Sequence, residues 1–182
     1  ALKILEIEWM SSLSDLSPLA TLAALEQLYA DGNRISDLSP LGQLPALDVL
    51  YLRENAVSDL SPLAEAPVLR SLYLDGNQVT NPEVLSEVES LRTLDLAHNG
   101  LTEVDGFSAL PQLTRIYLAG NAIQDASPLA AATGLRELDL SSNGFSNLAT
   151  LPEITIDGGL LLLGDNGITH LDSLVDYLAT SP

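Results

Sequence analysis

Cysteine is absent from the 182-residue chain, and positively charged residues are scarce. Without cysteine, no disulfide can form and no thiolate can bind a metal, so the sequence carries no sign of the redox compartment. Seven Lys and Arg stand against 25 Asp and Glu, which gives a formal net charge of −18. A surface of this sign repels phosphate backbones and anionic lipid headgroups. We therefore expect no nucleic-acid partner and no binding to anionic membranes.

Long hydrophobic runs are also missing, although 46% of the residues are hydrophobic. No apolar stretch approaches the roughly 18 residues that indicate a membrane span. No charged segment followed by an apolar core marks a signal peptide near Ala1. We expect a sizeable apolar core and no membrane insertion. The sequence leaves open the oligomeric state, and whether the chain is mature or part of a longer protein.

The sequence does contain an internal repeat. The pattern LxxLxLxxN occurs six times at a spacing of 22 residues, and a diverged copy lies 23 residues away at each end. Met10 replaces the asparagine in the first copy, and Gly158 replaces the first leucine in the last. We expect a single domain over residues 1–182, with eight repeats that start near residues 2, 25, 47, 69, 91, 113, 135 and 158.

One repeat, residues 69–77, indicates how each copy folds. Leu69, Leu72 and Leu74 are expected to point inward from a short strand, and Asn77 to bond the backbone of the turn that follows. The segment after the asparagine often reads DLSPL. Proline there excludes a second central strand, so 3₁₀ helix or irregular turn is expected.

The full pattern, LxxLxLxxNxIxDLxPLxxLxx, resembles the leucine-rich repeats of bacterial internalins and of the phosphatase-1 regulatory leucine-rich-repeat proteins. The resemblance covers residues 2 to about 178, and the DLSPL segment is closer to the internalins. It implies an α/β solenoid that is curved, with a parallel sheet on the concave face and 3₁₀ or turn segments on the convex face. It also implies a non-enzymatic module that binds another protein, and it favours the exterior or cell surface of a bacterium over the cytoplasm.

Four of the five tyrosines occupy one position of the repeat. That position lies between two inward leucines, so its side chain projects from the concave face. Along the chain it holds Glu6, Tyr29, Tyr51, Tyr73, Asp95, Tyr117, Asp139 and Leu162. Parallel strands lie about 4.8 Å apart, so the rings should form a ladder. Tyrosine is enriched at interfaces, but it also favours strands, so the ladder serves either a partner or the sheet alone.

The few positive charges also gather near the strands. Six fall within the strand motifs, and Arg34 follows the asparagine of the second repeat. This placement indicates a concave face suited to a protein surface, although mixed charges also serve solubility. We predict a partner site made of Tyr29, Tyr51, Tyr73, Tyr117, Arg53, Arg70, Arg92, Arg115, Asp95 and Asp139. The alternatives are a carbohydrate-binding platform on the tyrosines, or a spacer or scaffold domain of a larger surface or secreted bacterial protein.

A second polar column lies in the return segments: Asp15, Asp37, Asp59, Asn81, Glu103, Asp125, Asn147 and His170. Each side chain precedes a turn whose backbone N–H groups it can cap. Calcium needs six to eight converging oxygens, which a single file does not supply. We therefore expect capping, with no metal and no cofactor.

Catalytic motifs are missing. The sequence has no GxSxG, HExxH, P-loop or GxGxxG pattern, and His98 and His170 occupy unrelated positions of the repeat. We expect no enzymatic activity.

The two ends need caps, because a terminal repeat exposes its apolar edge. Trp9 and Met10 in the first repeat indicate an improvised cap or a surface that another segment covers. Leu171, Leu174, Val175 and Leu178 have helical spacing, which predicts a capping helix at about 171–179.

Overall fold

The computed structural model describes residues 1–148, 151 and 159–171. This part of the chain contains eight strands of three residues each and five short 3₁₀ helices. The strands are β1 (Ile4–Glu6), β2 (Gln27–Tyr29), β3 (Val49–Tyr51), β4 (Ser71–Tyr73), β5 (Thr93–Asp95), β6 (Arg115–Tyr117), β7 (Glu137–Asp139) and β8 (Leu160–Leu162). The helices are η1 (Ser17–Leu19), η2 (Ser61–Glu65), η3 (Glu83–Glu87), η4 (Asp105–Ala109) and η5 (Ser127–Ala131).

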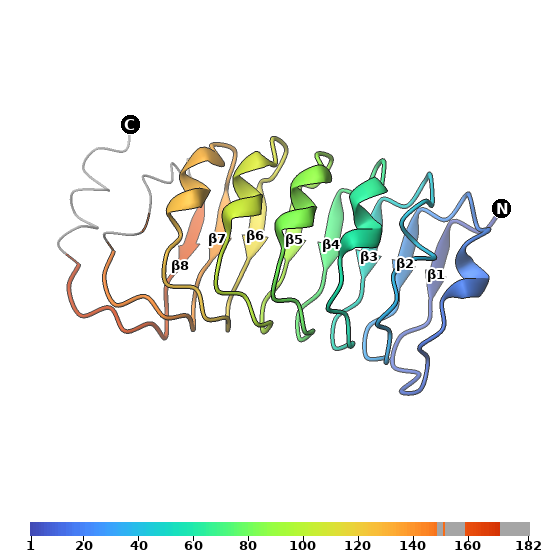
Figure 1. Ribbon diagram of the computed structural model, residues 1–182, viewed down its shortest axis with the longest axis horizontal. Helices are drawn as coiled ribbons and strands as arrows, with labels where there is room; N and C mark the ends of the chain where they lie inside the picture. Colours follow the sequence, from blue (N-terminus) through green and yellow to red (C-terminus); the bar gives the residue numbers. More distant parts are fainter. Residues whose placement is uncertain (149–150, 152–158, 172–182) are drawn as a thin grey trace.

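All eight strands pair in parallel and in chain order, so they form one open sheet. Each strand begins two residues after a repeat start expected from the sequence. The 3₁₀ helices lie in a row over the opposite side of the molecule (Figure 1). The expected leucine-rich-repeat solenoid is confirmed, with the sheet on one face and 3₁₀ turns on the other. We call the outward side of the sheet the sheet face.

The core lies between the sheet and the return segments. Leu69, Leu72 and Leu74 are fully buried, as the alternation of the strand predicts. The return segments add a second buried row, which includes Leu63, Leu85 and Phe107. Repeated in register through the solenoid, these residues make one continuous apolar core.

The asparagine column forms the expected ladder of hydrogen bonds. The Asn77 amide nitrogen donates to the carbonyl oxygens of Leu52 and Leu74, at 2.8 and 3.0 Å. Its side-chain oxygen accepts from the backbone N–H of Val57 at 2.9 Å. Asn55, one repeat earlier, and Asn99 and Asn121, one and two repeats later, repeat this arrangement. Each asparagine therefore ties the backbone of its own repeat to that of the preceding one.

The polar column on the return segments caps backbone at five of its eight predicted positions. Oxygens of Asp15, Asp37, Asp59, Asn81 and Asp125 each accept from the N–H two residues further on, at 2.8 to 2.9 Å. Hydrogen bonds from the serine at that position lower the pKa of the four aspartates. These side-chain oxygens therefore accept hydrogen bonds within local turns.

One turn position after the strands has a left-handed backbone in every repeat. In the first six repeats it alternates between a side chain and glycine: Trp9, Gly32, Glu54, Gly76, His98 and Gly120, with φ between 48° and 69°. Each side chain lies over the next glycine. A Cβ on Gly32 would lie 2.0 Å from the Trp9 ring, and one on Gly120 would lie 2.4 Å from the His98 ring. The glycines thus leave room for the preceding side chain, and Ser142 followed by Asp165 ends the alternation.

The terminal repeats present apolar side chains to solvent. Trp9 is 68% exposed, and Met10 and Ile4 are also exposed. At the other end, Leu160 and Leu162 project from the sheet face, as expected for their strand position. The predicted capping helix at about 171–179 lies outside the described residues, apart from Leu171.

Candidate functional site

Three tyrosines on consecutive strands form a stack on the sheet face. Tyr29, Tyr51 and Tyr73 are paired directly across β2, β3 and β4. Their ring centroids are 4.8 and 4.1 Å apart, with interplanar angles of 19° and 15°. The predicted ladder is therefore present over these three repeats. We call Tyr29, Tyr51 and Tyr73 the tyrosine stack.

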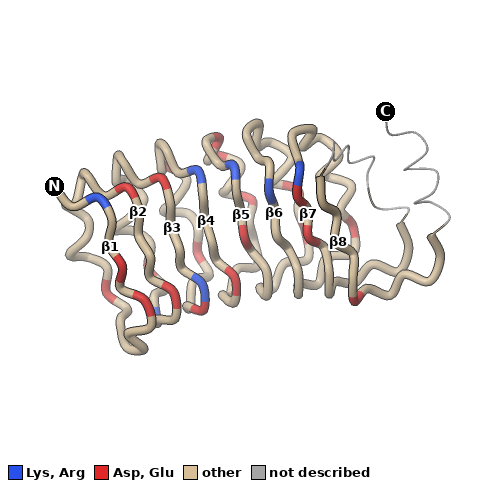
Figure 2. Tube along the Cα trace, turned by 180° about the vertical axis from the view of Figure 1, so that it is seen from behind, with Lys and Arg blue, Asp and Glu red and all other residues tan. Residues whose placement is uncertain are grey.

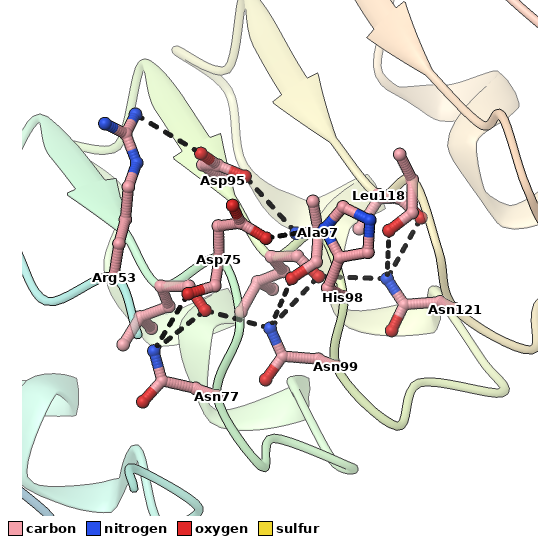
Figure 3. Close-up of polar contacts among 12 residues, drawn as sticks. Arg53, Asp75, Asn77, Asp95, Ala97, His98, Asn99, Leu118 and Asn121 are labelled. Atoms are coloured by element: carbon pink, nitrogen blue, oxygen red, sulfur yellow. Dashed lines mark hydrogen bonds and ion pairs between the residues drawn. The ribbon is translucent and has the colours of Figure 1, made fainter. Parts of the chain in front are cut away.

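Arg53 lies across the stack and reaches beyond it. Its guanidinium carbon is 5.1 Å from the Tyr51 ring centroid and 4.6 Å from that of Tyr73. The same guanidinium pairs with the Asp95 carboxylate at 3.4 Å, two strands away (Figure 3). Cation–π contact and ion pair together fix Arg53 against the rings.

Asp95 closes the far end of the stack. It follows Tyr73 in the same column, because Tyr73 pairs with Asp95 across β4 and β5. Burial raises the pKa of this carboxyl, while the N–H of Ala97 and the charge of Arg53 act in the opposite direction. A nearly buried carboxylate held by an arginine is a rigid part of the surface.

Tyr117 lies apart from the tyrosine stack, since Asp95 occupies the strand between them. Its hydroxyl bonds the Glu137 carboxylate, which also accepts from Arg115 Nε at 3.0 Å. The predicted single column of tyrosines is thus two clusters. Tyr117, Arg115 and Glu137 form the second one.

Arg70 and Arg92 lie at the edge of the sheet where the strands begin. Figure 2 shows positive charge at this edge from β4 to β7 and acidic residues at the same edge beside β2 and β3, while the opposite edge is mostly acidic. Arg70 pairs with Asp48 at 3.2 Å, and Arg92 is exposed. The structure therefore does not bring these two arginines to the tyrosine stack.

Asp139 makes a local turn contact. Its Oδ1 accepts from the backbone N–H and the hydroxyl of Ser141, at 2.9 and 2.6 Å. It shares the tyrosine column, across from Tyr117 on β6.

Three acidic residues and one histidine take part in these contacts although the sequence did not predict them as site residues. Glu137 and Asp48 pair with arginines that the sequence did highlight. Asp75 contacts the His98 ring at 2.7 Å, close to Asp95 and Arg53 in Figure 3. A sequence signal exists for the first two, because Arg70 follows Asp48 and Glu137 follows Arg115 by one repeat of 22 residues.

Two of the tyrosines should titrate late. Burial raises the pKa of Tyr51 and of Tyr117 to about 12, aided by the Tyr73 hydroxyl for Tyr51 and by Glu137 for Tyr117. The folded state holds these phenol protons more tightly than the unfolded state does. The contribution of the two protonated tyrosines to the stability of the fold is therefore complete below the ordinary pKa of 10.0, and it is lost as the pH rises toward 12. In an alkaline titration followed by phenolate absorbance, Tyr51→Phe and Tyr117→Phe should each remove one late component. A late component that persists unchanged in both variants would contradict this assignment.

Within the described ranges, no group of three or more His, Asp or Glu side chains is arranged to hold a metal ion. In the same part of the chain, none of the helices combines the length and apolar character that crossing a membrane requires.

Comparison with known proteins identifies related chains. Residues 23–65, 89–131 and 111–153 match the family described as "Leucine Rich repeats (2 copies)". An internalin (inlF) from Listeria monocytogenes superposes with a TM-score of 0.83 at 27% identity over 97% of this chain. A leucine-rich-repeat protein from Leptospira interrogans gives 0.79 at 25% identity over 89%, and internalin C2 from Listeria monocytogenes gives 0.68 at 26% over 90%. No curated protein sequence matches the chain.

The chain is shorter than these solved structures. It spans 58% of the first internalin, 43% of the Leptospira protein and 80% of internalin C2.

Proposed function

Because the chain belongs to the leucine-rich-repeat family, we propose that it is a non-enzymatic module whose sheet face binds another protein at the tyrosine stack. Leucine-rich-repeat domains are protein-interaction modules, and this chain resembles internalins. We further propose that residues 1–182 form one such domain, and that it acts outside the cell or at the surface of a bacterium. The similarity to proteins of Listeria and Leptospira supports the bacterial setting.

The stack itself is the observation that carries this proposal. Three large, half-buried rings lie in register on an otherwise acidic molecule, and Arg53 is held against them. Rings fixed in this way lose little side-chain entropy when a partner covers them. Hot spots of protein interfaces are likewise rich in tyrosine and arginine. Tyr117, with Arg115 and Glu137, extends the same surface across β6 and β7.

Carbohydrate binding has less support. A sugar ring packs against an aromatic face, but both faces of Tyr51 are covered by Tyr29 and Tyr73. Tyr51, at the centre of the stack, therefore presents its ring edge and hydroxyl group. Those groups suit a protein surface with mixed polar and apolar contacts. A role as spacer or scaffold, with the stack serving only the sheet, remains the competing proposal.

The double variant Tyr51→Ser/Tyr73→Ser tests the proposal. We expect it to fold like the wild type by circular dichroism, yet to lose a protein that the wild type captures from the lysate or culture medium of the source organism. Removing two central interface aromatics should weaken binding by at least about a hundredfold.

The matched control is Glu65→Ser/Glu87→Ser, which changes two exposed residues on η2 and η3. It should capture the same protein as the wild type. Equal recovery by the tyrosine variant and by this control would assign the stack to the sheet alone.

A further inference from the structure

Four of the seven positively charged residues line one groove at the strand-start edge of the sheet face. Arg70, Arg92, Arg115 and Arg136 surround a volume of about 490 Å³, together with Ser71 and Thr93. We call it the arginine groove. It crosses β4 to β7, beside the tyrosine stack rather than over it, and Figure 2 shows the row of arginines at this edge. In a chain of net charge −18, this concentration of positive charge has no counterpart elsewhere in the sequence.

Two of the four arginines are already neutralised within the protein. Arg70 pairs with Asp48, and Arg115 pairs with Glu137. Arg92 and Arg136 are exposed and have no ion-pair partner among the described residues. The groove thus offers two uncompensated guanidinium groups, each able to bind a carboxylate through two parallel hydrogen bonds.

The spacing of the strands sets the length of a ligand that fits. Arg92 and Arg136 belong to repeats that are two strands apart, or about 10 Å. An extended chain covers that distance in about three residues, and the whole groove from β4 to β7 in four or five.

The overall charge of the chain disfavours a long anionic polymer. Asp48 borders the groove toward β3 and is paired with Arg70, and Glu26, one repeat further, is paired with Lys3. A chain with a net charge of −18 repels a polyanion that extends beyond the arginines. A short, locally acidic ligand avoids this repulsion, whereas nucleic acid or a sulfated polysaccharide does not.

We propose that the arginine groove binds a short acidic segment of a protein partner, extended across β4 to β7, with carboxylates on Arg92 and Arg136. The proposal rests on the proposed function, because it names the kind of partner segment that meets the sheet face. It assigns Arg70, Arg92 and Arg115 to this groove and separates them from the tyrosine stack.

The test uses the complete 182-residue chain and a labelled synthetic peptide with a glutamate-rich centre and glycine–serine flanks. Fluorescence anisotropy at low salt should detect binding of this peptide, but not of its analogue with glutamine in place of glutamate. Arg92→Gln/Arg136→Gln should weaken binding by at least about tenfold. The control Lys3→Gln/Arg34→Gln removes two positive charges outside the groove, and it should change the affinity less than about twofold.

Three results would overturn the proposal. They are equal binding of the glutamate and glutamine peptides, equal weakening by the two double variants, and preference for a sulfated oligosaccharide of the same charge. Tyr51→Ser/Tyr73→Ser should retain the peptide. Loss of the natural partner by Tyr51→Ser/Tyr73→Ser tests the tyrosine stack, and loss of the peptide by Arg92→Gln/Arg136→Gln tests the arginine groove. The two proposals can therefore fail independently.

Discussion

Replacing Asn77 with alanine is expected to lower the free energy of unfolding by about 3 kcal/mol, because it leaves buried backbone groups without partners. Asn77 is 8% exposed. Its side chain accepts a hydrogen bond from the N–H of Val57 and donates to the carbonyls of Leu52 and Leu74. Water cannot easily replace the amide there. Each buried group left unpaired costs about 1–3 kcal/mol, so the loss of several contacts makes this one of the largest single effects in the chain.

Urea unfolding followed by circular dichroism measures this change. Gln78→Ala is the matched control, because its exposed side chain follows Asn77 directly, and it should stay within about 0.5 kcal/mol of the wild type. Similar stabilities for the two variants would mean that the asparagine ladder is not a main source of cohesion between repeats.

Replacing Phe107 with alanine is expected to cost about 3–5 kcal/mol, since it leaves a cavity in a fully packed row. Phe107 occupies the place that Leu63, Leu85 and Leu129 hold in other repeats. Gly106 precedes it, and a Cβ on that residue would lie 2.9 Å from the Cα of Glu83. The fifth repeat therefore combines a larger core residue with a smaller neighbour.

Phe107→Leu is the informative comparison. It restores the residue of the other repeats and should cost only about 1–2 kcal/mol. Equal destabilisation by leucine and alanine would show that the aromatic ring, rather than the filled volume, determines the stability of this repeat.

The fold follows from the sequence because the repeat spacing fixes strand register. Once Leu28, Leu50 and Leu72 are aligned at 22-residue intervals, Tyr29, Tyr51 and Tyr73 must lie side by side on the opposite face. The same logic predicts the asparagine ladder and the turn caps. These features depend on backbone position alone, which a regular sequence specifies well.

The arrangement of the candidate site was harder to predict, because it depends on how long side chains bend. Arg53 passes over two rings to reach Asp95, although Asp31 and Asp75 lie at its own repeat position in the neighbouring repeats. The sequence does place Asp95 between Tyr73 and Tyr117, but it does not indicate that Tyr117 bonds Glu137. The pairs Asp48–Arg70 and Arg115–Glu137, by contrast, could have been found by searching for opposite charges one repeat apart.

The alternation of side chain and glycine at the left-handed turn has a consequence for how such a chain can grow. A side chain on the glycine that follows Trp9, Glu54 or His98 would collide with it, so two successive repeats form one structural period, of 45 residues from Trp9 to Glu54 and of 44 from Glu54 to His98. Duplicating such a pair preserves every one of these contacts. Inserting or deleting one repeat would instead place two bulky side chains, or two glycines, next to each other. Within the first six repeats, the number of repeats should therefore change in steps of two, whereas the last two repeats, with Ser142 and Asp165, carry no such restriction.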